Sequence, residues 1–132
     1  PVPASTRQHL QLSDHVLMTG WLDNPSAAYA AMDLLAFPSY REGLPNVVLE
    51  AQLSGIPIVG YSATGTVNAI SDGRTGLLVP VADTDALIDA ISKLLFEEET
   101  RTSMGSAAHS FVGNRFKREL VWADLVSIYA EA

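Results

Sequence analysis

FPSYREGLPNVVLEA, residues 37–51, is the stretch of this sequence that decides the fold. The apolar run at residues 34–37 predicts a short strand that ends at Pro38. A polar loop with one glycine follows, and Pro45 stands in the first turn of a helix, where proline is favoured. In a parallel α/β sheet such a turn lies at the carboxyl end of the strand, where ligands bind. The free N–H groups of the helix attract anions there.

Two glutamates bracket this turn, with seven residues between them. Glu42 lies in the loop beside the helix entrance, and Glu50 lies about one and a half turns into the helix. No ion pair along the helix accounts for the charge of Glu50, because the side chains three and four positions away are uncharged (Asn46, Val47, Leu53 and Ser54). Apolar side chains occupy most of the helix surface, so we expect a helix largely covered by protein and a partner for Glu50 elsewhere. A ligand hydroxyl is one candidate, and a solvated or structural acid is the simpler alternative.

The rest of the chain continues the alternation of strands and helices. Apolar runs predict four strands, at about 15–20, 34–37, 57–61 and 77–79. Helices are predicted at 25–32 and 45–54, at 67–71, from Asp83 or Asp85 as the cap, from Thr100 to Gly113, and finally at 120–129. This order is typical of an α/β domain with a Rossmann-like parallel sheet and flanking helices.

Composition excludes several classes of function. A chain of 132 residues with 48% apolar content can bury one domain core, and a formal charge of −7 argues against a nucleic-acid surface or a polybasic membrane patch. No apolar run approaches the roughly 20 residues that span a bilayer, and no signal-peptide pattern opens the chain. The absence of cysteine fits a cytoplasmic location and removes thiolate chemistry, and the three histidines are scattered, so we expect no metal site.

The key stretch resembles the signature of retaining glycosyltransferases with the GT-B fold, in particular glycosyltransferase family 4. The matching features are the Pro-Ser, x, x, Glu-Gly loop at residues 38–43 and the two glutamates separated by seven residues. Further matching segments are the Asp-Gly at residues 72–73, the Thr-Gly at 75–76 and the Leu-Leu-Val at 77–79. The resemblance covers nearly all of this chain, whereas the chain covers only part of the family's length.

The resemblance implies a role for each residue of the turn. Glu50 would accept hydrogen bonds from the ribose hydroxyls of a nucleotide sugar, and Glu42 would bind hydroxyls of the donor sugar as the catalytic acidic residue. Unused backbone N–H groups around the helix entrance would face the diphosphate, so that no metal or other cofactor is needed. The segment concerned consists of Gly43, Leu44, Pro45, Asn46 and Val47.

Four further residues are candidates for substrate binding. The resemblance places the loop with Gly20 and Trp21 near the nucleotide base. For Trp21 the alternative is packing in the core, which we favour because buried aromatic side chains mostly belong to the core. Arg41 is a candidate for a phosphate or sugar contact. The alternative, which we favour, is that Arg41 is a solvated cation in the loop. Gly65 lies in a loop that in the family carries two glycines and a glutamate; here Thr64 and Asn68 take two of those places, so an ordinary turn is the alternative.

On this basis residues 1–132 form part of a GT-B C-terminal donor-binding domain. The family's domain begins with two more strands, which carry a Gly-Arg and a Lys for the diphosphate, and both are missing from this sequence, as is the N-terminal domain. The domain would therefore be truncated, and its open sheet edge suggests a homodimer. The parent enzyme would transfer a sugar from a nucleotide diphosphate sugar to a glycan or lipid-linked acceptor, in polysaccharide biosynthesis, in the cytoplasm or peripheral to the inner face of the membrane.

Two other classes of function remain open. A non-catalytic Rossmann-like module could bind a nucleotide or a partner, because fold alone does not determine activity. A nucleotide-sugar epimerase would share the GT-B architecture and differ only in the chemistry of the full enzyme. The first alternative is distinguished by whether Glu42 and Glu50 face one site beside the helix entrance.

Overall fold

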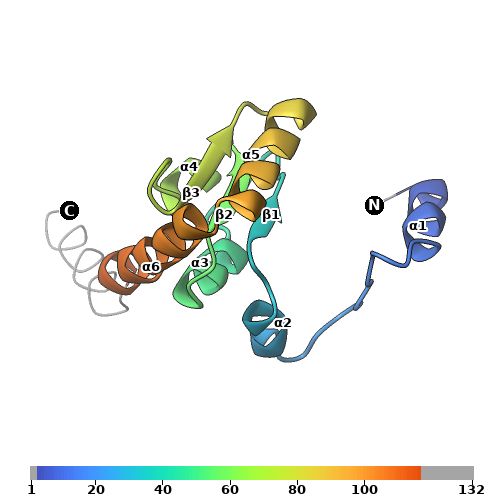
Figure 1. Ribbon diagram of the computed structural model, residues 1–132, viewed down its shortest axis with the longest axis horizontal. Helices are drawn as coiled ribbons and strands as arrows, with labels where there is room; N and C mark the ends of the chain where they lie inside the picture. The colour runs from blue at the N-terminus through green and yellow to red at the C-terminus, as the bar shows by residue number, and fades with distance from the viewer. Residues whose placement is uncertain (1–2, 117–132) are drawn as a thin grey trace, which may run out of the picture.

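The computed structural model describes residues 3–116, apart from the side chain of His9. Its centre is a parallel sheet of three strands in the order β1-β2-β3 (Figure 1). The strands are β1 (Leu35–Phe37), β2 (Ile58–Tyr61) and β3 (Gly76–Val79). The predicted α/β class with a parallel sheet is thus confirmed, and three of the four expected strands form.

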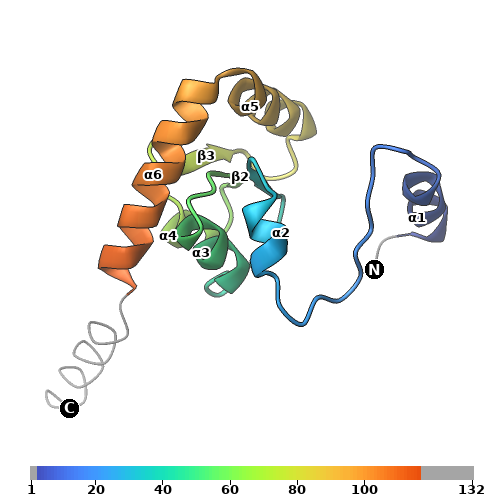
Figure 2. The ribbon, with the colours of Figure 1, turned by 60° about the horizontal axis from the view of Figure 1, so that its bottom comes forward.

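Six helices accompany the sheet in the described part of the chain: α1 (Ala4–Gln11), α2 (Ser26–Ala30), α3 (Asn46–Leu53), α4 (Thr66–Ala69), α5 (Thr84–Phe96) and α6 (Glu98–Arg115). Figure 2 shows the sheet between α5 on one side and α3 and α4 on the other, with α6 running alongside. The Asp83 side chain caps α5 by accepting from the Ala86 N–H, as predicted. Helix α6 begins at Glu98 rather than at Thr100, and the predicted helix at 120–129 lies outside the described residues.

The central strand β2 is buried along its whole length because both of its faces are covered. Ile58 points into a cluster with Val48 and Ala51 of α3, while Val59 points into a cluster on the other face with residues of α5. Side chains alternate between the faces of a strand, so two separate apolar layers form on one sheet. This burial explains the continuous apolar run that predicted the strand.

Helix α3 is covered on one side only, which corrects the expectation of a helix largely covered by protein. Val48, Ala51 and Gln52 are buried, whereas Val47, Glu50 and Leu53 are exposed. The covered side faces the sheet and α6. The exposed side has no neighbouring element among the described residues apart from α2.

The segment predicted as a strand at 15–20 is not a strand in this structure. Residues 12–24 form an extended link that holds α1 away from the body of the molecule (Figures 1 and 2). Leu17 is 87% exposed and Met18 47%. A strand is defined by hydrogen bonds to a neighbouring strand, and the described residues supply none beside this link. The prediction of a strand at 15–20 is therefore wrong for this structure, because apolar composition does not supply the partner strand.

Helix α6 packs closely against the end of α3 through Gly105. A methyl group at this position would overlap the carbonyl oxygen of Gly55. Gly113 lies two turns further along the same helix, where an added methyl group would meet no atom within 4 Å. The two glycines therefore form a matched pair, of which only Gly105 is required by packing.

We predict that Gly105→Ala lowers the free energy of unfolding by about 1–3 kcal/mol, because the added carbon overpacks the contact between α6 and the segment before β2. Gly113→Ala should raise it by roughly 0.5–1 kcal/mol, since alanine is the better helix former. Urea unfolding monitored by circular dichroism measures both changes. Equal effects of the two substitutions would contradict this account of α6 packing.

Candidate functional site

The candidate site lies at the carboxyl ends of β1 and β2, where two loops meet. The Glu42 N–H donates to the Thr64 carbonyl at 3.0 Å, which ties the loop after β1 to the loop after β2. Gly65 has φ +83°, and a side chain there would overlap the carbonyl oxygens of Glu42 and Gly43. Glycine is required at this position for both reasons. Gly65 thus has a structural role here, which is to let the two loops touch.

Glu42 is held in position by Ser39. The Ser39 hydroxyl donates to Glu42 Oε1 at 2.6 Å, within the same loop. The half-buried Glu42 carboxylate therefore has a fixed partner on one oxygen. The ring of Tyr40 packs edge-on against Tyr61 of β2, with 5.5 Å between centroids, and anchors the loop to the sheet. Arg41 is exposed beside it.

The entrance of α3 has the geometry of a helix N-terminus with free donors. Pro45 precedes the helix in an extended conformation, and its carbonyl accepts from the N–H groups of Val48 and Leu49. The N–H groups of Asn46 and Val47 precede this first helical bond and have no acceptor within the helix. Both residues are exposed. An anion can therefore approach these amides from solvent, where the helix dipole favours negative charge.

Glu50 has a partner that the sequence analysis did not name. The Tyr29 hydroxyl, on α2, donates to Glu50 Oε2 at 2.9 Å. The Tyr29 side chain is buried while Glu50 is exposed, so the tyrosine reaches the acid from the protein interior. Burial, followed by the hydrogen bond and the negative charge of Glu50, raises the pKa of Tyr29 to about 12. No signal in the sequence points to this contact between residues 21 positions apart.

A hollow of about 360 Å³ adjoins Glu50 between α2 and α3. It is lined by Pro25, Ser26, Tyr29, Glu50, Leu53 and Ser54. Glu42 and Glu50 thus engage different partners, Ser39 in the loop and Tyr29 on α2. The structure brings Glu42, Gly43 and Gly65 together through backbone contacts, and it places Glu50 on the adjoining helix.

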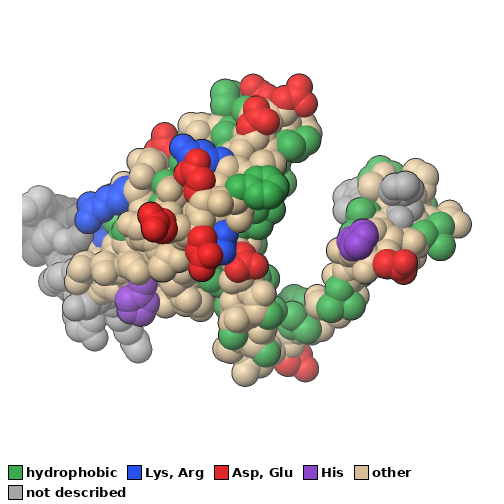
Figure 3. Space-filling view, viewed as in Figure 1, with side chains coloured by type: hydrophobic (Ala, Val, Ile, Leu, Met, Phe, Trp, Pro, Cys, Tyr) green, Lys and Arg blue, Asp and Glu red, His purple; other side chains and the backbone are tan. Residues whose placement is uncertain are grey.

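Gly20 and Trp21 lie in the extended link between α1 and α2. Trp21 is 90% exposed, and its indole N–H donates to Asp23 at 3.1 Å. The expectation that Trp21 packs in the core is therefore wrong for this structure, because the link has no element to pack against. Figure 3 shows hydrophobic side chains along the link and on the side of the body that faces α1. The structure does not bring these two residues to the loops after β1 and β2.

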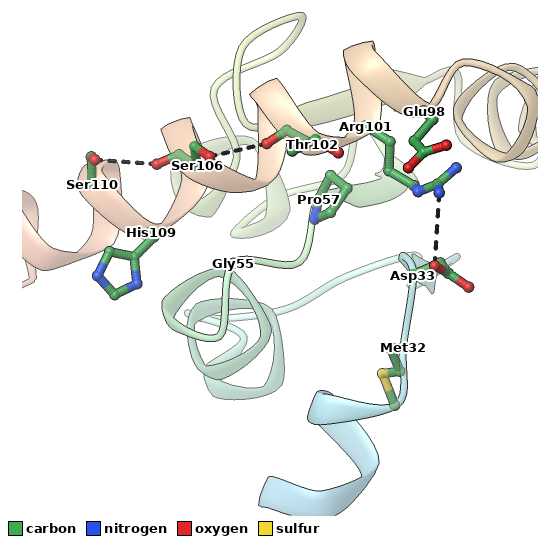
Figure 4. A pocket seen from close by; sticks show the side chains of 10 residues that line it. All are labelled: Met32, Asp33, Gly55, Pro57, Glu98, Arg101, Thr102, Ser106, His109 and Ser110. Carbon is green, nitrogen blue, oxygen red and sulfur yellow. Dashed lines mark hydrogen bonds and ion pairs between the residues drawn. The ribbon is translucent and has the colours of Figure 1, made fainter.

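A second hollow lies at the opposite, amino edge of the sheet (Figure 4). Its side chains hold helices together: Arg101 donates to the carbonyls of Leu94 and Leu95 at the end of α5 and lies 3.8 Å from Asp33. The ring Nδ1 of His109 bonds the Leu53 carbonyl at the end of α3. These contacts give hydrogen-bond partners to carbonyl groups at the ends of two helices, where the helix itself supplies none. The hollow therefore has a structural explanation.

Residues 3–116 contain neither a candidate metal site nor a candidate membrane-spanning helix. The acidic and histidine side chains described there form no group of three or more that could hold a metal ion. Within the same residues, no helix is both long and apolar enough to cross a bilayer.

The fold and the site define a Rossmann-like α/β domain with an anion-attracting helix entrance and two positioned acids. The sequence model of the family described as glycosyl transferases group 1 matches residues 2–97. The chain belongs to this family. The expectation from the key stretch is confirmed at this level.

Curated relatives agree with this assignment. The chain is 31% identical over 120 residues to the capsular polysaccharide biosynthesis glycosyltransferase CapM of Staphylococcus aureus, which covers 91% of the chain and 32% of CapM. It is 34% identical over 122 residues to the N-acetyl-alpha-D-glucosaminyl L-malate synthase of Bacillus anthracis, and the match covers 92% of the chain and 32% of that synthase. It is 40% identical over 106 residues to the D-inositol 3-phosphate glycosyltransferase of Corynebacterium aurimucosum, covering 80% and 25%. The chain thus spans a quarter to a third of the length of these relatives.

Solved structures show the same fold. The sucrose-phosphate synthase of Thermosynechococcus elongatus superposes with a TM-score of 0.85 at 27% identity, covering 96% of this chain and 32% of that one. HepE of Anabaena, solved in complex with UDP-glucose, has a TM-score of 0.85 at 22% identity, covering 97% and 35%. At that identity the second comparison supports the fold alone.

We predict that one of the four tyrosines titrates near pH 12 instead of near 10.0 and that Tyr29→Phe removes this late transition. Glu50→Gln should lower the pKa of Tyr29 but leave it above 10.0, because burial is the larger cause. The near-ultraviolet absorbance of the phenolate measures both effects.

The same shift predicts a pH dependence of stability. The folded state holds the Tyr29 proton more tightly than the unfolded state does. The contribution of the protonated Tyr29 to the free energy of unfolding is therefore complete below pH 10 and is lost as the pH rises toward 12. In Tyr29→Phe the fall in unfolding free energy over this interval should be smaller by roughly 2–3 kcal/mol. An identical fall in both proteins would contradict the raised pKa of Tyr29.

Proposed function

We propose that this chain is the nucleotide-sugar-binding part of a retaining glycosyltransferase of family 4, in a GT-B C-terminal domain. One observation supports this assignment beyond family membership. The amides of Asn46 and Val47 at the start of α3 are open to solvent. The acids on either side of them in the sequence are each held through one oxygen, Glu42 by Ser39 and Glu50 by Tyr29. Such an arrangement suits a ligand with a diphosphate flanked by two sets of hydroxyls.

In this proposal each group has a separate task. Glu50 accepts hydrogen bonds from ribose hydroxyls, and Glu42 accepts them from the donor sugar. The amides of Asn46 and Val47, with the dipole of α3, stabilise the negative charge that builds on the departing nucleotide diphosphate. This charge stabilisation comes from the backbone, so the proposal requires no metal. Arg41 is exposed next to Glu42 and is available for a phosphate or sugar contact.

The acceptor and the remaining catalytic groups belong, in this proposal, to the rest of a longer enzyme. The acceptor is a glycan or a lipid-linked molecule, consistent with the capsular polysaccharide name of one relative. The enzyme acts in the cytoplasm or at the inner face of the membrane. Gly20 and Trp21 approach the nucleotide base only in the complete site.

We predict that a nucleoside diphosphate shifts the amide resonances of residues 40–50 and that Glu50→Gln weakens this binding about 10-fold or more, since a hydrogen bond to a charged group contributes roughly 1.5–3 kcal/mol. Glu42→Gln should weaken binding of the nucleotide sugar but not of the nucleotide alone. Titrations with UDP, GDP and ADP, each with and without an attached sugar, measure these effects. Glu99→Gln, an exposed acid on α6, is the control.

The outcome separates this proposal from the alternatives. A regulatory nucleotide module predicts equal affinity for the nucleotide and its sugar derivative. An epimerase predicts conversion of the bound sugar nucleotide by the longer enzyme without an acceptor. Transfer to an acceptor with retained anomeric configuration supports the proposal directly.

The proposal includes a homodimer through the outer edge of β1. The Leu35 N–H donates to the Pro57 carbonyl on the side of β2. In a parallel strand the N–H and C=O of one residue face the same side, and successive residues face opposite sides. The backbone groups of Ala36 therefore point to the open edge. We predict a dimer by light scattering at high concentration. Ala36→Pro should return it to a monomer, since proline removes the outward donor, while Ala36→Thr should not. A monomeric wild type would contradict the dimer.

A further inference from the structure

Tyr29 stands apart from the other groups at the site because it connects the core to an exposed acid. Its ring is part of the apolar cluster that also contains Val48 and Ile58, so its position is fixed by packing. Its hydroxyl reaches out of this cluster to Glu50 Oε2 at 2.9 Å. Glu50 is exposed and on the uncovered side of α3. Of the two partners, the tyrosine is therefore the rigid one.

A free glutamate on a helix surface samples several rotamers, and ordering it costs entropy when a ligand binds. The Tyr29 hydrogen bond reduces that cost by selecting one orientation in advance. It is also a charge-assisted bond, which is stronger than one between neutral groups. A carboxylate held through Oε2 presents Oε1 in a defined direction, and each of its oxygens can accept more than one hydrogen bond.

The hollow beside Glu50 supplies the place for a small hydroxylated group. It is lined on the α2 side by Pro25 and Ser26 and on the α3 side by Leu53 and Ser54, and its volume is about 360 Å³. Small-molecule sites begin at roughly this size. Tyr29 forms part of its wall as well as the support for Glu50.

We infer that Tyr29 is a positioning residue that holds Glu50 for a ribose and thereby makes the site select ribonucleotides over deoxyribonucleotides. This inference rests on the proposed function, in which Glu50 accepts the ribose hydroxyls. Tyr29 touches Glu50 and acts on the ligand through it. The selectivity follows because a pre-oriented carboxylate loses most when the hydroxyl it awaits is missing.

The test compares the affinity of the chain for a nucleoside diphosphate with its affinity for the 2′-deoxy and 3′-deoxy forms. The wild type should prefer the ribonucleotide about 10-fold or more, the equivalent of roughly 1.4 kcal/mol. In Tyr29→Phe the preference should fall to within about twofold, with a weaker effect on affinity for the deoxy forms. Tyr61→Phe removes the same hydroxyl from another buried tyrosine, whose ring packs on Tyr40, and should keep the preference.

Glu50→Gln changes the other partner of the Tyr29–Glu50 hydrogen bond. It tests the inference independently in case Tyr29→Phe does not fold. The double variant with Tyr29→Phe should lose no more preference than either single one, since the two residues act as a unit. A ribose preference retained in Tyr29→Phe overturns the inference. Nucleotide binding without ribose preference in the wild type overturns this inference and the ribose role of Glu50, but leaves the nucleotide-sugar-binding assignment intact. Absence of all nucleotide binding overturns the proposed function and this inference with it.

Discussion

The burial of β2 on both of its faces is the constraint on which the rest of the structure depends. A parallel strand between two others needs cover above and below, and here α3 and α4 provide one cover and α5 the other. Each crossover from strand to helix must therefore turn at the carboxyl edge of the sheet. The loops after β1 and β2 are neighbours for this reason, and Gly65 lets their backbones touch. The candidate site is a consequence of how the core is closed.

The protein supports each of the two acids of the candidate site with a hydroxyl. Ser39 supports Glu42 from within the loop, and Tyr29 supports Glu50 from the core. The two supports differ in rigidity, because a serine moves with its loop while a packed tyrosine ring does not. The loop and the helix can therefore respond differently to a ligand, with the Glu50 side already ordered and the Glu42 side free to adjust with its loop.

Much of this arrangement could be predicted from the sequence because local signals and packing agree there. The strands at 57–61 and 77–79 and the helix at 45–54 are each found within one residue or two. The prediction failed where structure depends on partners distant in sequence. The Tyr29–Glu50 bond joins residues 21 positions apart, and no periodicity announces such a contact. The prediction that the helix at 45–54 is largely covered by protein was wrong for a related reason, since apolar composition does not tell which neighbouring elements are present.

The link at 12–24 shows the same limit most clearly. Its residues have the composition of a buried strand, yet Leu17 and Trp21 are almost fully exposed. Apolar side chains held at a distance from their own core are suited to contact with another part of a polypeptide or a second copy. Strand formation at 15–20 then depends on that contact, since a ladder needs two strands.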